Sequence, residues 1–548
     1  MTRNKRNSLT LSNLALSVLL LGLFRPGFAG ATDFVSLHAG SWFDAASTWG
    51  QSSNPGNGDN VEISAAVDYV VFDPSTSGLS VTISNLYLYN GTLWVDSSPS
   101  TLTMAGTNSL FSGNCFLNGV GGVLHNQGTV FQSSDGPLNI GNQTTFENEM
   151  AGTYNLEGDS GVTGSGYSYF NNYGLLRKIG GNGISLFNSH VYFNNLNGVI
   201  EVDSGTLSLA TGGTSTSGAF IVASGALLDL TGGNDPYWSG LVNGSGAGTV
   251  SLSSGTLHAS PSLTLNLPDG LFQWTGGTLS GTTINANVIT VAGSGSVNMN
   301  GVFYNNGLLH QTNTATLNLV NNTTFENQAG GIYNLEGDGG VAGSGYFNNS
   351  GLLRKSGGNG TSIFNGISFN NQNGSIEVDS GQLSLNGQGY AQGSGSLIVT
   401  LGGTNVGQFG QLVCGSATLG GPLQVKLAGG FVPAQGDQFQ IISCSGLAGA
   451  FSSTNLPAGI SMSYSNNGVY LIMMKPAPAQ LLNPVVTDGN FTFAFDTVNS
   501  QSYTIQHNDD LATTNWISDT NFTGNGSLMQ VLTPITNVPM RFYRVREP

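Results

Sequence analysis

The stretch that decides the fold lies at residues 323 to 371, and its sequence is TTFENQAGGIYNLEGDGGVAGSGYFNNSGLLRKSGGNGTSIFNGISFNN. Here a Phe is followed two positions later by Asn, with Gly close behind, and the pattern belongs to a series with a constant spacing. The pairs of this series are Phe303 with Asn305, Phe325 with Asn327, Phe347 with Asn349, and Phe369 with Asn371. A period near 22, with Gly and Asn between short alternating apolar runs, predicts a coil of three strands and three turns.

The same pattern occurs earlier in the chain, at slightly less regular steps. Its pairs are Leu124 with Asn126, Phe146 with Asn148, Phe170 with Asn172, and Phe193 with Asn195. One coil cannot bury its inward side chains, whereas stacked coils pair their backbones about 4.8 Å apart and enclose an apolar interior. We therefore expect an all-β parallel β-helix, a solenoid in which Phe stacks on Phe and Asn forms an amide ladder at an inward corner.

A longer duplication is superimposed on the short repeat. The segment TTFENEMAGTYNLEGDSGVTGSGY from Thr144 matches TTFENQAGGIYNLEGDGGVAGSGY from Thr323, and GLLRK, FNN and IEVDSG occur in both copies. The offset between the copies changes only from 179 to 176, so a block at about 122–210 was copied to about 301–386. If residues 32–475 are all coil, they form about 20 turns and a rod of roughly 95 Å.

The N-terminus has the features of an export signal. Arg3, Lys5 and Arg6 precede an apolar run from Leu9 to Phe24, which is followed by Ala29-Gly30-Ala31. This order is typical of a signal peptide, so we expect residues 1–31 to be removed by cleavage near Ala29 to Ala31. A membrane anchor is the alternative, but three polar residues interrupt the run. No later segment is apolar enough to span a bilayer, so we expect a mature chain that is secreted or held at the cell surface.

The charge balance excludes some partners. The sequence has 13 basic and 29 acidic residues, and loss of residues 1–31 removes four basic ones, which changes the net charge from -16 to -20. Nucleic acids and anionic membranes require clustered Lys and Arg, so neither is expected as a partner. The three cysteines, Cys115, Cys414 and Cys444, are too few and too scattered for a disulfide framework or a zinc site. A bridge between Cys414 and Cys444 stays open.

Two segments resemble a known family. SWFDAASTWGQSSNPGNGDNVEI, with Trp42 and Trp49, resembles the opening of secreted, autotransporter-associated repeat proteins of Gram-negative bacteria. GQLVCGSATLGGPLQVKLAGGFVPAQGDQFQIISCSGLAGAF, from Gly410 to Phe451, resembles the closing strands of such proteins. The resemblance implies a β-helix over 32–475 with closing strands over 410–475, a first turn capped by the tryptophans, and an adhesin-like role. The chain departs from the family after Lys475, where no translocator barrel is expected.

A separate module is expected at the C-terminus. Residues 476–482 follow Lys475 and begin with Pro-Ala-Pro-Ala, which predicts a linker because Pro favours extended backbone and cannot join a central strand. Residues 483–548 alternate like the strands of a small antiparallel β-sandwich. They resemble a C-terminal module of large secreted proteins from environmental Gram-negative bacteria, and this resemblance indicates a location more than an activity.

Candidate catalytic groups are few. Enzymes built on β-helices use paired carboxylates, or a base near acidic calcium ligands. The candidates are Glu157 and Asp159 with their copies Glu336 and Asp338, and Arg177-Lys178 with its copy Arg354-Lys355. Since both copies keep these residues, we interpret Gly-Asp as turn chemistry and Arg-Lys as a solvated strand edge. Neither Asp159 nor Asp338 has the spaced oxygen ligands of a calcium site. We predict no catalytic, cofactor-binding or metal-binding residues and no cofactor.

The histidines and two tryptophans are the remaining candidates. The histidines are His38, His125, His190, His258, His310 and His507, and none has a metal-ligand spacing. We interpret all six as structural or incidental. Trp238 and Trp274 are candidates for stacking on sugars, although a lone aromatic residue in a solenoid is usually core or cap.

The leading hypothesis is a non-enzymatic, secreted or cell-surface, adhesin-like solenoid. The alternative is a carbohydrate-binding or carbohydrate-active protein, similar to a polysaccharide lyase or hydrolase. Expected partners are extracellular polysaccharide or cell-surface components. An enzyme needs loops that gather side chains in one place, so if the chain has a hidden site we expect it within residues 205–300, where the period is least regular.

Overall fold

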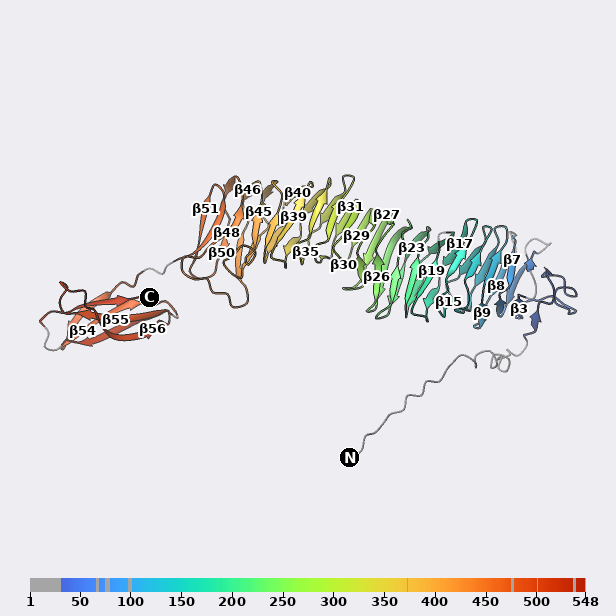
Figure 1. Ribbon diagram of the computed structural model, residues 1–548, viewed down its shortest axis with the longest axis horizontal. Coiled ribbons are helices and arrows are strands. Elements are labelled where there is room, and N and C mark those ends of the chain that lie inside the picture. Colours follow the sequence, from blue (N-terminus) through green and yellow to red (C-terminus); the bar gives the residue numbers. More distant parts are fainter. Residues whose placement is uncertain are drawn as a thin grey trace, which may run out of the picture. The chain divides into compact units, whose positions relative to one another are not determined.

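The chain forms a long parallel β-solenoid followed by small antiparallel sheets (Figure 1). The computed structural model describes residues 31–65, 69–73, 79–96, 101–188, 190–371, 373–474, 478–499, 501–535 and 539–547. The predicted signal peptide, except Ala31, and Lys475 to Ala477 of the predicted linker region lie outside them. The parallel β-helix is confirmed, with about 17 turns of about 23 residues. The estimate of 20 turns was wrong because long segments, such as 42–59 and 428–437, contribute no strand.

Each early turn contributes strands to parallel sheets that we name A, B and C. Sheet A begins with β1 (Asp33–Val35), β3 (Asn60–Ser64), β6 (Leu86–Tyr89), β9 (Ser109–Ser112), β12 (Thr129–Gln132), β15 (Thr153–Leu156), β18 (Leu175–Lys178) and β21 (Val199–Val202). Sheet B begins with β2 (Gly40–Ser41), β4 (Val70–Phe72), β7 (Thr92–Val95), β10 (Cys115–Asn118), β13 (Leu138–Ile140), β16 (Val162–Gly164), β19 (Ile184–Phe187) and β22 (Thr206–Leu209). Sheet C begins with β5 (Ser80–Ile83), β8 (Thr101–Met104), β11 (Val123–Asn126), β14 (Thr145–Asn148), β17 (Ser168–Asn172) and β20 (Val191–Asn195).

Strand β14 shows how the sequence alternation builds the wall. Phe146 and Asn148 are buried, whereas Thr145 and Glu147 are partly exposed. Successive side chains of a strand point to opposite faces, so residues two apart share the interior or the surface. Burial of a Phe side chain contributes roughly 1.5–3 kcal/mol, and each turn adds several such residues to one continuous core.

Stacked identical residues line the interior, as the repeat predicted. The rings of Phe325 and Phe347 are stacked at 4.6 Å, and those of Phe146 and Phe170 at 5.0 Å. The buried asparagines form two ladders in which each amide nitrogen donates to the amide oxygen of the next residue at 2.6–2.8 Å. The ladders contain Asn126, Asn148, Asn172 and Asn195, and Asn285, Asn305, Asn327, Asn349 and Asn371. The predicted amide ladder is confirmed.

The middle of the solenoid has longer strands, each of which runs through two sheets. These are β23 (Thr214–Val222), β25 (Tyr237–Ser245), β27 (Thr256–Asn266), β29 (Thr278–Asn285) and β31 (Ser296–Asn305). Their N-terminal halves continue sheet C and their C-terminal halves continue sheet A. Sheet B continues through β24 (Leu227–Asp229), β26 (Thr249–Leu252), β28 (Phe272–Trp274), β30 (Val288–Val291) and β32 (Leu308–Gln311).

The second copy of the duplicated block lies one sheet further along the coil than the first. The TFEN segment forms β14 in sheet C in the first copy, but its counterpart β34 (Thr324–Asn327) pairs with the half of β31 that continues sheet A. The strands of this region are β33 (Thr316–Leu319), β36 (Gly340–Gly343) and β39 (Thr361–Asn365) in sheet C, β34, β37 (Tyr346–Asn349) and β40 (Ser368–Asn370) in sheet A, and β35 (Ile332–Leu335), β38 (Leu352–Lys355) and β41 (Ser375–Val378) in sheet B.

The first turn is closed by aromatic residues. Trp42 and Trp49 are buried, with ring centroids 5.5 Å apart in an edge-to-face arrangement, and Trp42 also packs against Phe72. Both indole nitrogens donate hydrogen bonds to backbone carbonyls, that of Trp42 to Pro55 and that of Trp49 to Trp42. The tryptophans thus cover the apolar interior with their polar atoms satisfied, which is the capping role expected of them.

The predicted closing segment contains further strands. The strands before this segment are β42 (Gln382–Ser384), β43 (Gly389–Ala391) and β44 (Leu397–Leu401). The strands within it are β45 (Gln411–Val413), β46 (Ser416–Leu419), β47 (Leu423–Leu427), β48 (Gln438–Ser443), β49 (Leu447–Gly449), β50 (Thr454–Asn455), β51 (Ile460–Ser465) and β52 (Gly468–Met473). Cys414 and Cys444 follow two of these strands, and both are buried free thiols, as is Cys115. The bridge left open between Cys414 and Cys444 is therefore not formed.

The C-terminal module consists of two three-stranded antiparallel sheets. One contains β53 (Leu482–Thr487), β54 (Asn490–Asp496) and β57 (Leu528–Pro534), and the other contains β55 (Ser502–Asn508), β56 (Ile517–Thr523) and β58 (Phe542–Arg546). Phe493, Phe495, Tyr503 and Ile505 form the core between them. Its first strand begins one residue before the predicted boundary. Among the described residues of the chain, no helix has the length and hydrophobicity that a membrane span requires.

Candidate functional site: a tyrosine groove on sheet C

The outer surface of sheet C carries a column of polar side chains. Parallel pairing places Thr103, His125, Glu147, Asn171 and Asn194 next to one another on successive strands. The Asn194 amide donates to Asn171 at 2.8 Å, and the Asn171 amide donates to Glu147 at 3.3 Å. These residues alternate with the buried Phe and Asn residues, so the pairing that builds the core also aligns this column.

A second column on the same surface is aromatic. Tyr169 of β17 pairs with Tyr192 of β20, and their rings are stacked at 5.5 Å. Tyr167 stacks on the same Tyr192 ring at 6.1 Å, with only 12° between the ring planes. Tyr167 is 68% exposed and Tyr169 is 38% exposed. Exposed aromatic rings are costly to leave in water, and three in contact form a flat apolar platform.

Tyr167 owes its position to a two-residue insertion in the first copy of the block. The first copy has GSGYSYFNN where the second has GSGYFNN, and the pairing register equates Tyr169 with Tyr346, which leaves Tyr167 and Ser168 as the insertion. Tyr167 has a backbone φ of 62°, in the left-handed region that residues other than Gly and Asn seldom occupy. The insertion therefore holds a large apolar ring outward at the cost of local strain.

The platform forms one side of a groove with a volume of about 610 Å³, which we name the tyrosine groove. It is lined by Tyr167, Tyr169, Tyr192 and Tyr237, by the amides of Asn171 and Asn194, and by Asp235. Tyr237 is 46% exposed and stacks on His258 at 4.5 Å. Among the described residues that line the groove, Asp235 is the only charged one.

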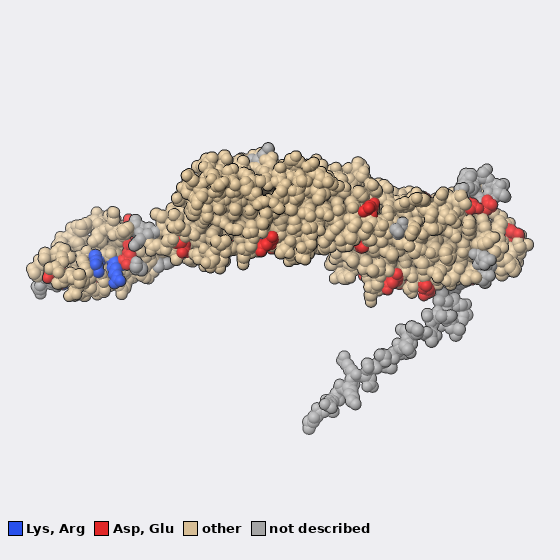
Figure 2. Space-filling view, turned by 45° about the horizontal axis from the view of Figure 1, so that its top comes forward, with Lys and Arg blue, Asp and Glu red and all other residues tan. Residues whose placement is uncertain are grey.

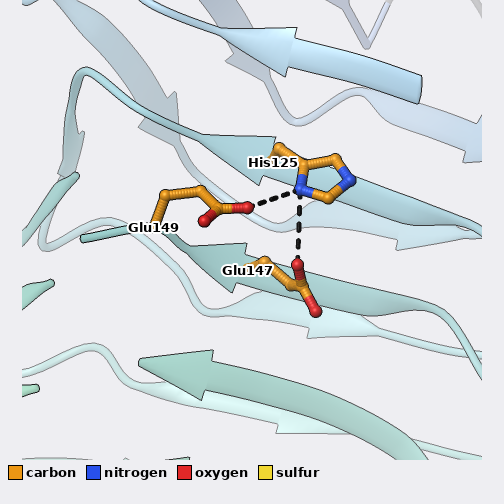
Figure 3. Close-up of side chains that lie close together, drawn as sticks. All are labelled: His125, Glu147 and Glu149. Atoms are coloured by element: carbon orange, nitrogen blue, oxygen red, sulfur yellow. Dashed lines mark hydrogen bonds and ion pairs between the residues drawn. The ribbon is translucent and has the colours of Figure 1, made fainter. Parts of the chain in front are cut away.

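A histidine and two glutamates lie on the same sheet (Figure 3). The Nδ1 atom of His125 is 2.8 Å from Glu149 Oε1 and 3.3 Å from Glu147 Oε2. The side-chain hydrogen bond between His125 and Glu147 raises the pKa of the histidine and lowers the pKa of the carboxyl. Glu147 is also held by Asn171, which lines the tyrosine groove, so the two features are neighbours.

The prediction that the duplicated Arg-Lys pairs form a solvated strand edge was wrong for both lysines. Lys178 is fully buried, and its ammonium group donates to the carbonyls of Gly158 and Gly180, to Ser185 and to Asp159. In the second copy, Lys355 is equally buried and makes the corresponding contacts with Gly337, Gly357, Ser362 and Asp338. Each ammonium group joins a turn to the neighbouring strand. A buried charge is tolerated only when it is paired and hydrogen-bonded, and these contacts meet that condition.

The other half of each pair does face outward. Arg177 forms ion pairs with Glu201 at 3.4 Å and Asp203 at 2.7 Å. Arg354 forms the equivalent pairs with Glu377 and Asp379. The remaining candidates, Glu157 and Glu336, differ in their surroundings. Glu336 contacts His310 at 2.6 Å, whereas burial raises the pKa of Glu157. Within the described residues, the duplicated lysines and arginines therefore join turns and strands to one another.

The two tryptophans considered for sugar stacking belong to the core. Trp238 is 2% exposed and Trp274 is fully buried. Half of the twelve residues that line the tyrosine groove, from Gly212 to Tyr237, lie in the irregular stretch 205–300, and the other half precede it. The groove tyrosines were missed because they come from different turns of the coil and meet only once the register is known. The mismatch between GSGYSYFNN and GSGYFNN was the signal that marked them.

One face of the solenoid is poor in charge. Figure 2 shows a few scattered acidic side chains on one face of the solenoid and long stretches without Lys or Arg. No family model matches the chain, and no curated protein matches it. The site therefore has to be judged on its own geometry.

Proposed function

We propose that this protein is a secreted or cell-surface, adhesin-like solenoid without catalytic activity, and that its tyrosine groove binds a neutral polysaccharide. The observation that carries this proposal is the exposed platform of Tyr167, Tyr169 and Tyr192. The apolar C–H faces of a pyranose ring pack well on a tyrosine face, while the phenol oxygen stays in contact with water and hydroxyl groups.

The polar lining of the groove suits sugar hydroxyl groups. Asn171 and Asn194 present amide groups that both donate and accept hydrogen bonds, and they are already aligned by their contact with each other. Alignment before binding reduces the entropy that the protein loses when a ligand is held. A groove that combines aromatic rings with a few fixed polar groups is typical of small-ligand sites.

The charge of the groove favours a neutral glycan over an acidic one. Asp235 lines the groove, and Glu147 accepts a hydrogen bond from Asn171, which also lines it. A uronate or sulfate group would be repelled by these carboxylates, and among the described lining residues there is no Lys or Arg to pair with it. The likeness of the opening and closing segments to autotransporter-associated repeat proteins supports a place outside the cell.

The alternative is a carbohydrate-active enzyme. Glycoside hydrolases of the common type use two carboxyl groups on either side of the scissile bond. Asp235 is the only carboxylate among the described residues that line the groove. This single acid favours binding over cleavage.

The test uses the chain from residue 32 to 548 on an array of neutral and acidic polysaccharides, with the release of new reducing ends measured in parallel. The variant Tyr167→Asn/Tyr192→Ser removes two rings, with Asn chosen because it tolerates a left-handed backbone and Ser because Ser368 stands at that place in the second copy. Each lost ring contact is worth about 1 kcal/mol, so binding should weaken by about 30-fold.

The matched control is Tyr346→Ser, which removes an exposed tyrosine at the equivalent place of the second copy. It should leave binding unchanged. Binding of neutral glycans that falls in the double variant alone supports the proposal. Absence of binding, or equal binding by all three proteins, overturns it, and new reducing ends establish the enzyme instead.

A further inference from the structure

Three potential metal ligands converge on the outer surface of sheet C. His125 lies on β11, Glu147 lies opposite it on β14, and Glu149 follows at the end of that strand (Figure 3). One imidazole nitrogen and one oxygen from each carboxylate all lie within 4.8 Å of one another. All three side chains are 21–31% exposed, so an ion from solution can reach them.

The spacing of these atoms suits a small transition-metal ion. Bonds of about 2.0–2.1 Å in a tetrahedral site place neighbouring ligand atoms about 3.3 Å apart. The distance from His125 Nδ1 to Glu147 Oε2 is 3.3 Å, and that to Glu149 Oε1 is 2.8 Å, so only a small outward movement of Glu149 is needed. One nitrogen with two carboxylate oxygens is a donor set for Zn²⁺ and its neighbours, whereas Ca²⁺ requires six or more oxygens.

The backbone around the cluster is fixed. Glu149 N donates to the carbonyl of Asn126 at 2.9 Å, which anchors the turn beside the strand that carries His125. Directly beneath, the buried amides of Asn126 and Asn148 are hydrogen-bonded to each other. Asn171 holds Oε1 of Glu147, which leaves Oε2 directed at the histidine. Such outer contacts orient ligands in metal sites.

The duplication shows that the fold does not need these side chains. In the second copy, Tyr304 stands at the place of His125, Glu326 at that of Glu147 and Gln328 at that of Glu149. The backbone is nevertheless the same, because Gln328 N donates to the carbonyl of Asn305 just as Glu149 N does to Asn126. Two of the three ligands are therefore features of the first copy alone.

We propose that His125, Glu147 and Glu149 bind one divalent transition-metal ion of the Zn²⁺ class, with solvent in the remaining coordination position. The neutral imidazole and two carboxylates would balance the charge of the ion. This site is independent of glycan binding by the tyrosine groove, although Asn171 touches both.

The experiment titrates Zn²⁺ into metal-free protein, residues 32–548, by calorimetry, with Ca²⁺ as the comparison ion. Co²⁺ provides a second readout, because a visible absorption band reports low coordination number and does not depend on activity. The variants His125→Tyr and Glu149→Gln install the residues of the second copy, so both are expected to fold, and circular dichroism checks this. The control His310→Tyr removes another histidine, whose Nδ1 lies 2.6 Å from Glu336 and whose Nε2 lies 4.0 Å from Asp269, so that each nitrogen faces one carboxylate.

We expect one equivalent of Zn²⁺ in the wild type and in His310→Tyr, no comparable binding of Ca²⁺, and at least a tenfold weaker site in each of the other two variants. Tyr167→Asn/Tyr192→Ser should bind Zn²⁺ as the wild type does, which separates this proposal from glycan binding. The proposal is overturned if the folded wild type binds no stoichiometric Zn²⁺, or if His125→Tyr binds it with unchanged affinity.

Discussion

The amide ladder should be a main source of local stability, and strand β37 offers a direct test. Asn349 and Asn348 are adjacent but face opposite sides of the wall. Asn349 is 1% exposed, accepts a hydrogen bond from Asn327 at 2.7 Å, and donates to Asn371 at 2.6 Å and to the Ser375 carbonyl at 3.2 Å. Replacement by Ala removes two buried hydrogen bonds and one partly buried one, and it leaves their partners unsatisfied.

The magnitude follows from these contacts. Each net hydrogen bond is worth about 1 kcal/mol, and a buried partner left unpaired adds a desolvation penalty of about 1–3 kcal/mol, so Asn349→Ala should cost about 3–5 kcal/mol. Asn348 makes one hydrogen bond, to Glu326 at 2.7 Å, at a partly exposed position. Asn348→Ala should therefore cost about 0.5 kcal/mol.

Hydrogen exchange measured by mass spectrometry is the suitable assay, since a solenoid can open locally without global unfolding. Exchange of backbone amides in β37 and β38 should accelerate by two to four powers of ten in Asn349→Ala and by about twofold in Asn348→Ala. Amides in β3 and β6, far along the stack, should not change in either variant. Equal acceleration by the two substitutions would refute the idea that the ladder stabilises the turns.

Three further predictions concern single positions. Lys355→Met should lower the free energy of unfolding by about 3 kcal/mol, because the ammonium group is buried and paired. Arg354→Met should lower it by less than about 1 kcal/mol, because the Arg354 side chain is 40% exposed. Denaturant titration measures both. The Cys414 thiol should resist Ellman's reagent at pH 8 in the folded protein and react once the protein is unfolded, because burial raises its pKa to about 12 and the thiolate is the reactive form. Gly351→Ala should cost about 3 kcal/mol, since a methyl group would overlap two carbonyl oxygens of the preceding turn, whereas Gly295→Ala has open space around it and should be neutral; thermal unfolding compares the two.

The sequence predicted the fold well because the repeat places like residues on like. A Phe or Asn that recurs at a constant spacing can stack only if the chain coils with that period, so the ring stacks and the amide ladders followed from the spacing alone. It predicted the lysines badly. In LLRK, Leu176 and Lys178 share one face and Leu175 and Arg177 the other, and the two leucines leave open which face is buried. The place where the chain turns decides which face of the strand is buried, and the sequence does not show that place.

The same ambiguity hid the site. In SYFNN, Tyr169 and Phe170 are both aromatic, and only the register shows that the phenylalanine is buried and the tyrosine exposed. Their partners on β20, one turn later in the chain, are again a tyrosine and a phenylalanine, and the same ambiguity applies to them. The sequence could identify a stretch rich in aromatic residues but could not separate core from surface within it.

The duplication then distinguishes what the fold needs from what it does not. Both copies keep the buried Lys, its Asp partner, the Phe stack and the Asn ladder, although the second copy lies one sheet further along the coil. The first copy alone has His125, Glu149, Tyr167, Tyr173 and Tyr192 at places where the second has other residues or none. Side chains required by packing would be present wherever the block folds, so these five are free of that requirement. They nevertheless gather around sheet C, where Tyr167 and Tyr192 stack and where burial, followed by the charges of the two glutamates, raises the pKa of Tyr173. Residues that the fold leaves free to vary, yet that meet in one place, are what the two proposed binding sites on this surface require.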